Sequence, residues 1–238
     1  MKMKIFRFVK MFRTPPELLL LYIMNQTYIK KLIEQGEGQQ LDFKFAVNDS
    51  RKIARSLSAF SNTSGGTLLI GVKDNGSIAG IRTIEELYML EAAASVYTKP
   101  VVHFESKEWN IGGKRVLEVN VLKSGDAPHR APDEEGNWKT YLRVGDENIV
   151  APQLAERYFR LKKENKNSFI RYGEDEKMVL ACLNHSNEST FAGIRKATGI
   201  GRGRLENLLL SMMLMDIISM DFTCNPVRFR LIKVGNLL

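Results

Sequence analysis

The chain has 238 residues, of which 44% are hydrophobic and 26% are charged. These proportions are typical of a folded protein with one or two domains and exclude a disordered chain. Its two cysteines, Cys182 and Cys224, lie far apart without a CxxC pair, and the three histidines are scattered. This spacing favours neither a disulfide framework nor a zinc site, and it favours a reducing compartment.

The net charge of +8 is unevenly distributed along the chain. Residues 24–152 carry 16 Lys and Arg against 17 Asp and Glu, whereas residues 153–238 carry 14 against 9. Clustered Lys and Arg displace counterions from nucleic acid, so a surface that binds nucleic acid is expected mostly in the C-terminal part of the chain. The alternative is that the positive excess only aids solubility.

The first 23 residues differ from the rest of the chain. They contain five basic residues, Pro15-Pro16 and most of an apolar run that ends at Met24. This run is too short to span a bilayer, and no small-residue cleavage site follows it. We interpret residues 1–23 as an extension, either a loosely ordered arm or a segment upstream of a translation start at Met24. No other segment approaches transmembrane length, so a cytoplasmic location without membrane contact is expected.

A short helix and a half-buried strand are expected first, over residues 28–33 and 41–45. A helix capped at residues 48–50 then continues to Phe60. The diglycine Gly65-Gly66 turns the chain into an apolar strand over residues 67–72. Asp74-Asn75-Gly76 has the composition of a hairpin turn, which predicts a partner strand over residues 77–81.

Thr83 and Glu86 form a capping box for the next helix, which ends before Pro100. A hairpin around Gly112-Gly113, a polar loop and one further strand are expected to follow, over residues 101–122, 123–139 and 141–145. Helices that interleave with hairpins in this way predict an α+β domain over residues 24–152.

Three motifs of this region occur in a fixed order. They are Glu37-(x4)-Asp42-Phe43-Lys44, then Ala59-Phe60-Ser61-Asn62-Thr63-(x)-Gly65-Gly66-Thr67-Leu68-Leu69-Ile70-Gly71-Val72, and finally Tyr141-Leu142-Arg143-Val144-Gly145. Their order and spacing resemble the Schlafen AlbA-type DNA-binding domain family over residues 25–151. The resemblance implies an AlbA-like mixed sheet with packed helices. It also implies a transcriptional regulator or a divergent ATP-binding protein.

Five cations of this domain are candidates for phosphate contacts. Three of them, Arg51, Lys52 and Arg55, lie on a helix face opposite its apolar residues. The other two, Lys44 and Arg143, lie on strands that the resemblance places in one sheet, although a charge on the solvent face of a sheet more commonly has no ligand.

The backbone N–H groups of Gly65-Gly66 are a further candidate for binding phosphate, and the family description implies ATP. However, the chain has no GxxxxGK[ST] motif, and a strand follows the glycines where a Walker loop would be followed by a helix.

Some Schlafen relatives are nucleases, which gives an enzymatic alternative. The resemblance carries their acidic residues onto Glu37, Asp42 and Asp74, which would bind Mg²⁺ or Mn²⁺. Lys44 would orient the attacking water or stabilise developing charge. Asp42 stands where the family more usually has Glu, and a turn accounts for Asp74 equally well. Under the binding hypothesis no cofactor is expected.

A second domain is expected over residues 174–238, after a helix and linker over residues 153–173. Three amphipathic helices are predicted, with a turn at Gly199-Ile200-Gly201 before the third, and a hairpin around Asn225-Pro226 follows. This order looks like a winged helix-turn-helix.

In that class, the third helix enters the major groove with its N-terminal residues nearest the bases. Arg202 and Arg204 occupy this end, and Arg228 and Arg230 share one face of the last strand. The alternative is a winged helix used only for protein contacts. The sequence therefore predicts a transcriptional regulator that binds double-stranded DNA, with a homodimer as the default assembly.

Overall fold

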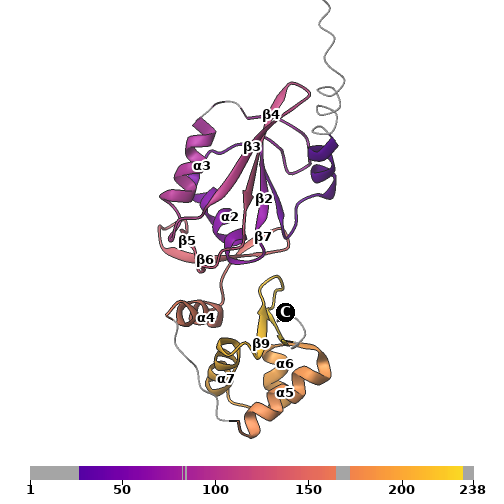
Figure 1. The fold of residues 1–238 in the computed structure, drawn as a ribbon, viewed down its shortest axis with the longest axis vertical. Coiled ribbons are helices and arrows are strands. Elements are labelled where there is room, and N and C mark those ends of the chain that lie inside the picture. The colour runs from indigo at the N-terminus through magenta and orange to yellow at the C-terminus, as the bar shows by residue number, and fades with distance from the viewer. Residues whose placement is uncertain (1–26, 82, 84, 165–171, 233–238) are drawn as a thin grey trace, which may run out of the picture.

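The structure is a computed structural model that describes residues 27–81, 83, 85–164 and 172–232. Predictions for residues 1–23 and for linker residues 165–171 lie outside this range. A mixed α+β domain is followed by a smaller unit of helices and short strands (Figure 1). The predicted α+β class is confirmed.

The central sheet has four strands in the order β1-β2-β4-β3. β1 is parallel to β2, and the other pairs are antiparallel. The strand bounds are β1 Leu41–Lys44, β2 Gly66–Ile70, β3 Phe104–Ile111 and β4 Lys114–Val121. The hairpin predicted around Gly112-Gly113 is confirmed. The turn predicted at Asp74-Asn75-Gly76 is present and carries an antiparallel bridge from Val72 to Ile78, but the partner strand predicted over residues 77–81 is wrong, because β2 pairs with β1 and β4.

Helices cover both faces of the central sheet. Two helices, α2 (Ser50–Asn62) and α3 (Glu85–Ser95), pack on one face, and helical residues 27–35 pack on the other. Successive strand residues point to opposite faces, so Leu68 packs with α2 and α3 while Leu69 packs with Ile29. The continuous apolar run of β2 reflects this double burial.

The turn from α2 to β2 is packed rather than open. Gly65 has φ +71°, and a Cβ there would lie 2.7 Å from the carbonyl oxygen of Val121. A Cβ on Gly66 would overlap the ring of Phe60. The Gly65 N–H donates to the Phe60 carbonyl oxygen at 2.9 Å. This packing and the use of the Gly65 N–H within the protein argue against the diglycine as the candidate phosphate site.

A second antiparallel sheet, in the order β5-β6-β7, lies against α2. Its strands are β5 Arg130–Pro132, β6 Trp138–Val144 and β7 Glu147–Val150. The amide of Asn62 at the end of α2 donates to the carbonyl oxygens of His129 (2.8 Å) and Tyr141 (2.9 Å). The predicted strand over residues 141–145 is confirmed as part of β6. The polar loop predicted over residues 123–139 is wrong in part, since it contains β5 and the start of β6.

The C-terminal unit follows α4 (Gln153–Lys163). Its elements are α5 Glu174–Ser186, β8 Glu188–Thr190, α6 Phe191–Thr198, α7 Arg202–Leu214, β9 Ile218–Asp221 and β10 Arg228–Leu231. The strands form an antiparallel sheet in the order β8-β10-β9. The three predicted helices and the predicted hairpin are present, and β8 is additional. The winged-helix assignment itself stays a prediction.

One hydrophobic cluster joins α4 to this C-terminal unit. The buried side chains of Ala155 and Phe159 pack in the same cluster as Leu205, Leu209 and other residues of α7. The cluster also contains Leu142 of β6, so α4 bridges the second sheet and the C-terminal helices. Among the helices that the structure describes, none has the length and hydropathy to cross a membrane.

Candidate nucleic-acid interface and buried ion network

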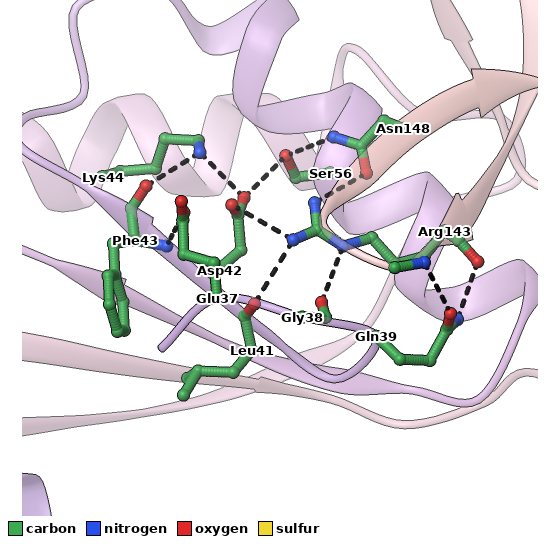
Figure 2. A network of polar contacts seen from close by, with 11 residues as sticks. Glu37, Gly38, Gln39, Leu41, Asp42, Phe43, Lys44, Ser56, Arg143 and Asn148 are labelled. Atoms are coloured by element: carbon green, nitrogen blue, oxygen red, sulfur yellow. Dashed lines mark hydrogen bonds and ion pairs between the residues drawn. The ribbon is translucent and has the colours of Figure 1, made fainter. Parts of the chain in front are cut away.

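A buried ion network connects the two sheets of the first domain (Figure 2). Its centre is Asp42 of β1, which is 2% exposed. The Asp42 carboxylate lies 2.8 Å from Lys44 Nζ, and 3.3 Å from Arg143 of β6. The Ser56 hydroxyl of α2 donates to it at 3.3 Å, and the Asn148 amide of β7 donates to the Ser56 oxygen at 2.9 Å.

Arg143 is 1% exposed, and its guanidinium is surrounded by acceptors. Besides Asp42, it donates to the carbonyl oxygens of Gly38 (3.1 Å) and Leu41 (3.3 Å) and to the Asn148 side chain (3.2 Å). The prediction that Arg143 contacts phosphate is therefore wrong, because no surface of the side chain is available. The prediction that Lys44 and Arg143 share a sheet is also wrong, since β1 and β6 belong to different sheets.

The carboxyl groups of Glu37 and Asp42 shift each other's pKa in opposite directions. Burial, together with the hydrogen bond to Asp42, raises the pKa of Glu37 above its ordinary value, and the Phe43 N–H that donates to Glu37 at 2.7 Å opposes this rise. Burial alone would raise the pKa of Asp42, but the Lys44 charge and the Glu37 hydrogen bond lower it below its ordinary value. Asp42 is therefore ionised and already neutralised by Lys44 and Arg143.

The three acidic residues proposed to bind a metal, Glu37, Asp42 and Asp74, do not lie together. Asp74 is exposed in the turn after β2, and among the described residues no three His, Cys, Asp or Glu side chains are grouped to hold a metal ion. Lys44 Nζ occupies the position beside Asp42 that a cation would take, and it also donates to the Phe43 carbonyl oxygen at 2.8 Å. In this arrangement the side chains of Glu37, Asp42 and Asp74, the metal ligands of the nuclease alternative, are not grouped to share a metal ion. The network joins the two sheets through β1, α2, β6 and β7.

The three cations predicted on α2 do not share one environment. Arg51 and Lys52 are exposed in the first turn of the helix. Arg55 is half-buried: its Nε donates to the Pro132 carbonyl oxygen at 2.9 Å, and its guanidinium lies 3.7 Å from Glu134. Two of the three therefore remain accessible to a ligand, and Arg55 connects α2 to the second sheet.

The four predicted C-terminal arginines all lie at the surface. The side chains of Arg202 and Arg204 are 73% and 74% exposed in the first turn of α7. On β10, Arg228 and Arg230 are exposed while Phe229 between them is 1% exposed, as the alternation predicts. Each arginine has a protein partner: Glu206 at 3.0 Å for Arg202, Asp175 for Arg204, Glu188 for Arg228 and the Ser219 hydroxyl at 3.4 Å for Arg230.

Sequence reasoning missed two groups of cations. Arg195 and Lys196 are exposed in the last turn of α6, and Arg195 lines a pocket together with Arg202 and Phe229. Four further cations surround Trp138 in a second pocket, to which residues from three distant parts of the chain contribute. The charge sums divided this second group, since Lys99 and Arg130 lie in the nearly neutral region 24–152 and Arg160 and Lys163 lie in the basic region 153–238.

The domain up to β7 is thus a mixed α+β unit with a central sheet covered on both faces. Residues 37–152 match the family model described as Schlafen, AlbA_2. The resemblance predicted from the three motifs is confirmed.

One relative matches two thirds of the chain. It is an uncharacterized ATP-binding protein of Ureaplasma parvum serovar 3 (strain ATCC 700970), and it is 25% identical over 173 residues. The match covers 67% of this chain and 46% of that protein, so the chain spans about half the length of this relative.

Two solved structures are similar at low sequence identity. The DIP2311 protein of Corynebacterium diphtheriae is 16% identical with a TM-score of 0.42, and the match covers 71% of this chain and 35% of that one. The N-terminal domain of an ATP-dependent DNA helicase RecG-related protein of Nitrosomonas europaea is 19% identical with a TM-score of 0.35. That match covers 52% of this chain and 90% of the domain.

Proposed function

We propose that the protein is a DNA-binding transcriptional regulator whose C-terminal unit binds duplex DNA as a winged helix. The observation that carries the proposal is the exposure of Arg202 and Arg204 at the N-terminal end of α7. A helix that follows a short turn after α6 has the position of a recognition helix, whose first residues reach the bases. The β9–β10 hairpin would then be the wing, with Arg228 and Arg230 toward the DNA backbone.

The partners of these arginines are compatible with exchange for phosphate. Glu206 lies one turn after Arg202 on the same helix, and Asp175 lies on α5. Exposed ion pairs of this kind contribute about 0–1 kcal/mol, whereas a guanidinium binds a phosphate through two parallel hydrogen bonds. The carboxylates therefore orient the arginines in the free protein without holding them strongly.

Fluorescence anisotropy with a labelled DNA duplex tests this proposal in the full chain. The double variant Arg202→Ala with Arg204→Ala is expected to weaken binding and to reduce the slope of log K against log salt by about 1.8, because each phosphate contact contributes about 0.9. The matched control, Lys30→Ala with Lys31→Ala, removes the same charge from exposed helical positions of the first domain. Equal duplex binding by both double variants and the wild type would refute the role of α7.

The assembly and a second ligand are also part of the proposal. A symmetric homodimer is expected because such regulators read half-sites related by two-fold symmetry, and sedimentation of the protein alone and with duplex would show it.

The description of the Ureaplasma parvum relative as an ATP-binding protein favours ATP as a second candidate ligand. Because the diglycine turn is packed, ATP would need another site.

A further inference from the structure

A pocket of about 630 Å³ lies between the second sheet and α4. Figure 1 shows β5 and β6 at the end of the first domain that faces α4. The ion pair between Arg130 of β5 and Glu156 of α4, at 3.2 Å, connects the two sides. The volume is in the range of pockets that bind small ligands.

The lining of this pocket combines positive charge with one large aromatic ring. Its charged and aromatic residues are Lys99, Arg130, Trp138, Arg160, Lys163 and Glu164. Within the described part of the chain, Arg130 is paired with Glu156, whereas no ion pair to a carboxylate is found for Lys99, Arg160 or Lys163. Glu164 is the one carboxylate among the lining residues, so the four cations of the lining outnumber it, and this balance favours an anion with several oxygens, such as phosphate.

Trp138 gives the pocket a second chemical property. The ring is half-buried, and Lys99 Nζ lies over it at 4.1 Å from the centroid. A lysine on a flexible stem can leave the ring, and an exposed cation–π contact is weaker than the stacking of a base on an aromatic side chain. A base that replaces Nζ on the ring would free this ammonium group to bind a phosphate beside it.

We propose that this pocket binds a nucleotide, with the base stacked on Trp138 and the phosphate held by Lys99, Arg160 and Lys163. The ligand is either a free nucleoside phosphate or an unpaired nucleotide of a single strand, since both present the same base and phosphate. The site lies outside the C-terminal surface proposed for duplex DNA, and it gives the ATP candidate a location. A duplex with all bases paired offers no base to the ring.

Tryptophan fluorescence of the full chain tests the proposal. The chain has two tryptophans, and Trp109 is 7% exposed, so quenching by a stacked base comes mainly from Trp138. Titration with ATP and with a twelve-nucleotide oligothymidylate is expected to give saturable quenching for at least one probe. Saturation by ATP alone would identify a free nucleotide as the ligand, and saturation by the oligonucleotide alone would identify a single strand.

Two variants of the pocket residues test whether the probe binds in this pocket. Trp138→Leu is expected to weaken binding about tenfold, measured by anisotropy of the labelled probe that saturates. Arg160→Gln with Lys163→Gln changes two exposed side chains of α4 and is expected to weaken binding while folding is retained. For the oligonucleotide it should reduce the salt slope by about 1.4.

Two control variants separate binding in this pocket from binding elsewhere on the protein. Lys107 lies 3.8 Å above the ring of Trp109, so Lys107→Ala removes an equivalent lysine–tryptophan contact and should leave binding unchanged. Arg202→Ala with Arg204→Ala should leave the quenching of Trp138 by ATP unchanged, which makes failure of this proposal distinguishable from failure of the duplex proposal. Absence of saturable binding by either probe, or wild-type affinity of both pocket variants, would overturn the inference.

Discussion

Replacement of Asp42 by asparagine should destabilise the first domain more than replacement of its partner Arg143 by methionine. Asp42→Asn leaves the guanidinium of Arg143 1% exposed with neutral acceptors. Loss of one partner from a buried pair costs about 3–5 kcal/mol, because the remaining charge is buried without compensation. Arg143→Met leaves Asp42 with Lys44 at 2.8 Å, so a smaller cost of about 1–3 kcal/mol is expected.

Urea unfolding monitored by tryptophan fluorescence measures both effects, since Trp109 and Trp138 lie in this domain. With an m value of about 2 kcal/mol/M, Asp42→Asn should lower the midpoint by about 2 M. The control Glu108→Gln breaks an exposed pair with Arg115, separated by 3.7 Å, and should change the stability by less than about 1 kcal/mol. A cost for Asp42→Asn no larger than that of the control would refute the reasoning on the buried charge.

Two further predictions concern packing and pH. Gly65→Ala should lower the thermal unfolding midpoint more than Gly112→Ala. Both glycines have positive φ, but a Cβ at Gly65 would meet the Val121 carbonyl oxygen at 2.7 Å, whereas a Cβ at Gly112 would meet no atom within 4 Å. Equal losses in the two variants would contradict the packed turn. Burial lowers the pKa of His129 below 6.5, so the folded state favours the neutral ring. The unfolded chain binds a proton near pH 6.5, and stability should therefore fall as the pH is lowered through that value. His129→Gln should flatten this part of the stability profile measured by urea unfolding, and an unchanged profile would contradict the assignment.

The sequence was sufficient for features that depend on local pattern. The hairpin at Gly112-Gly113, the buried strand after Gly65-Gly66 and the alternation around Phe229 follow from turn composition and from the period of two along a strand. Each of these signals is contained in about ten consecutive residues, so no knowledge of distant partners is needed.

Features that depend on distant residues were not predictable in this way. Arg143 has the sequence context of a surface strand, and it is buried because β6 packs on α2 rather than beside β1. The strand expected after Asp74-Asn75-Gly76 is reduced to a single bridge from Val72 to Ile78, because β2 is already paired on both edges, with β1 and β4. The cations around Trp138 come from three segments between residues 99 and 163. A backbone bridge joins Lys99 to Arg130, and α4, which is connected to β5 by the Arg130–Glu156 ion pair, adds Arg160 and Lys163.

Contact between nucleic acid and the exposed arginines of α7 is central to the proposed function. Anisotropy of a labelled duplex at two salt concentrations, with the wild type, the Arg202→Ala and Arg204→Ala double variant and the Lys30→Ala and Lys31→Ala control, tests it most directly. We predict duplex binding that weakens with salt and is lost selectively in the arginine variant. Binding that is unchanged in the arginine variant, or equally weakened in the lysine control, would contradict this prediction.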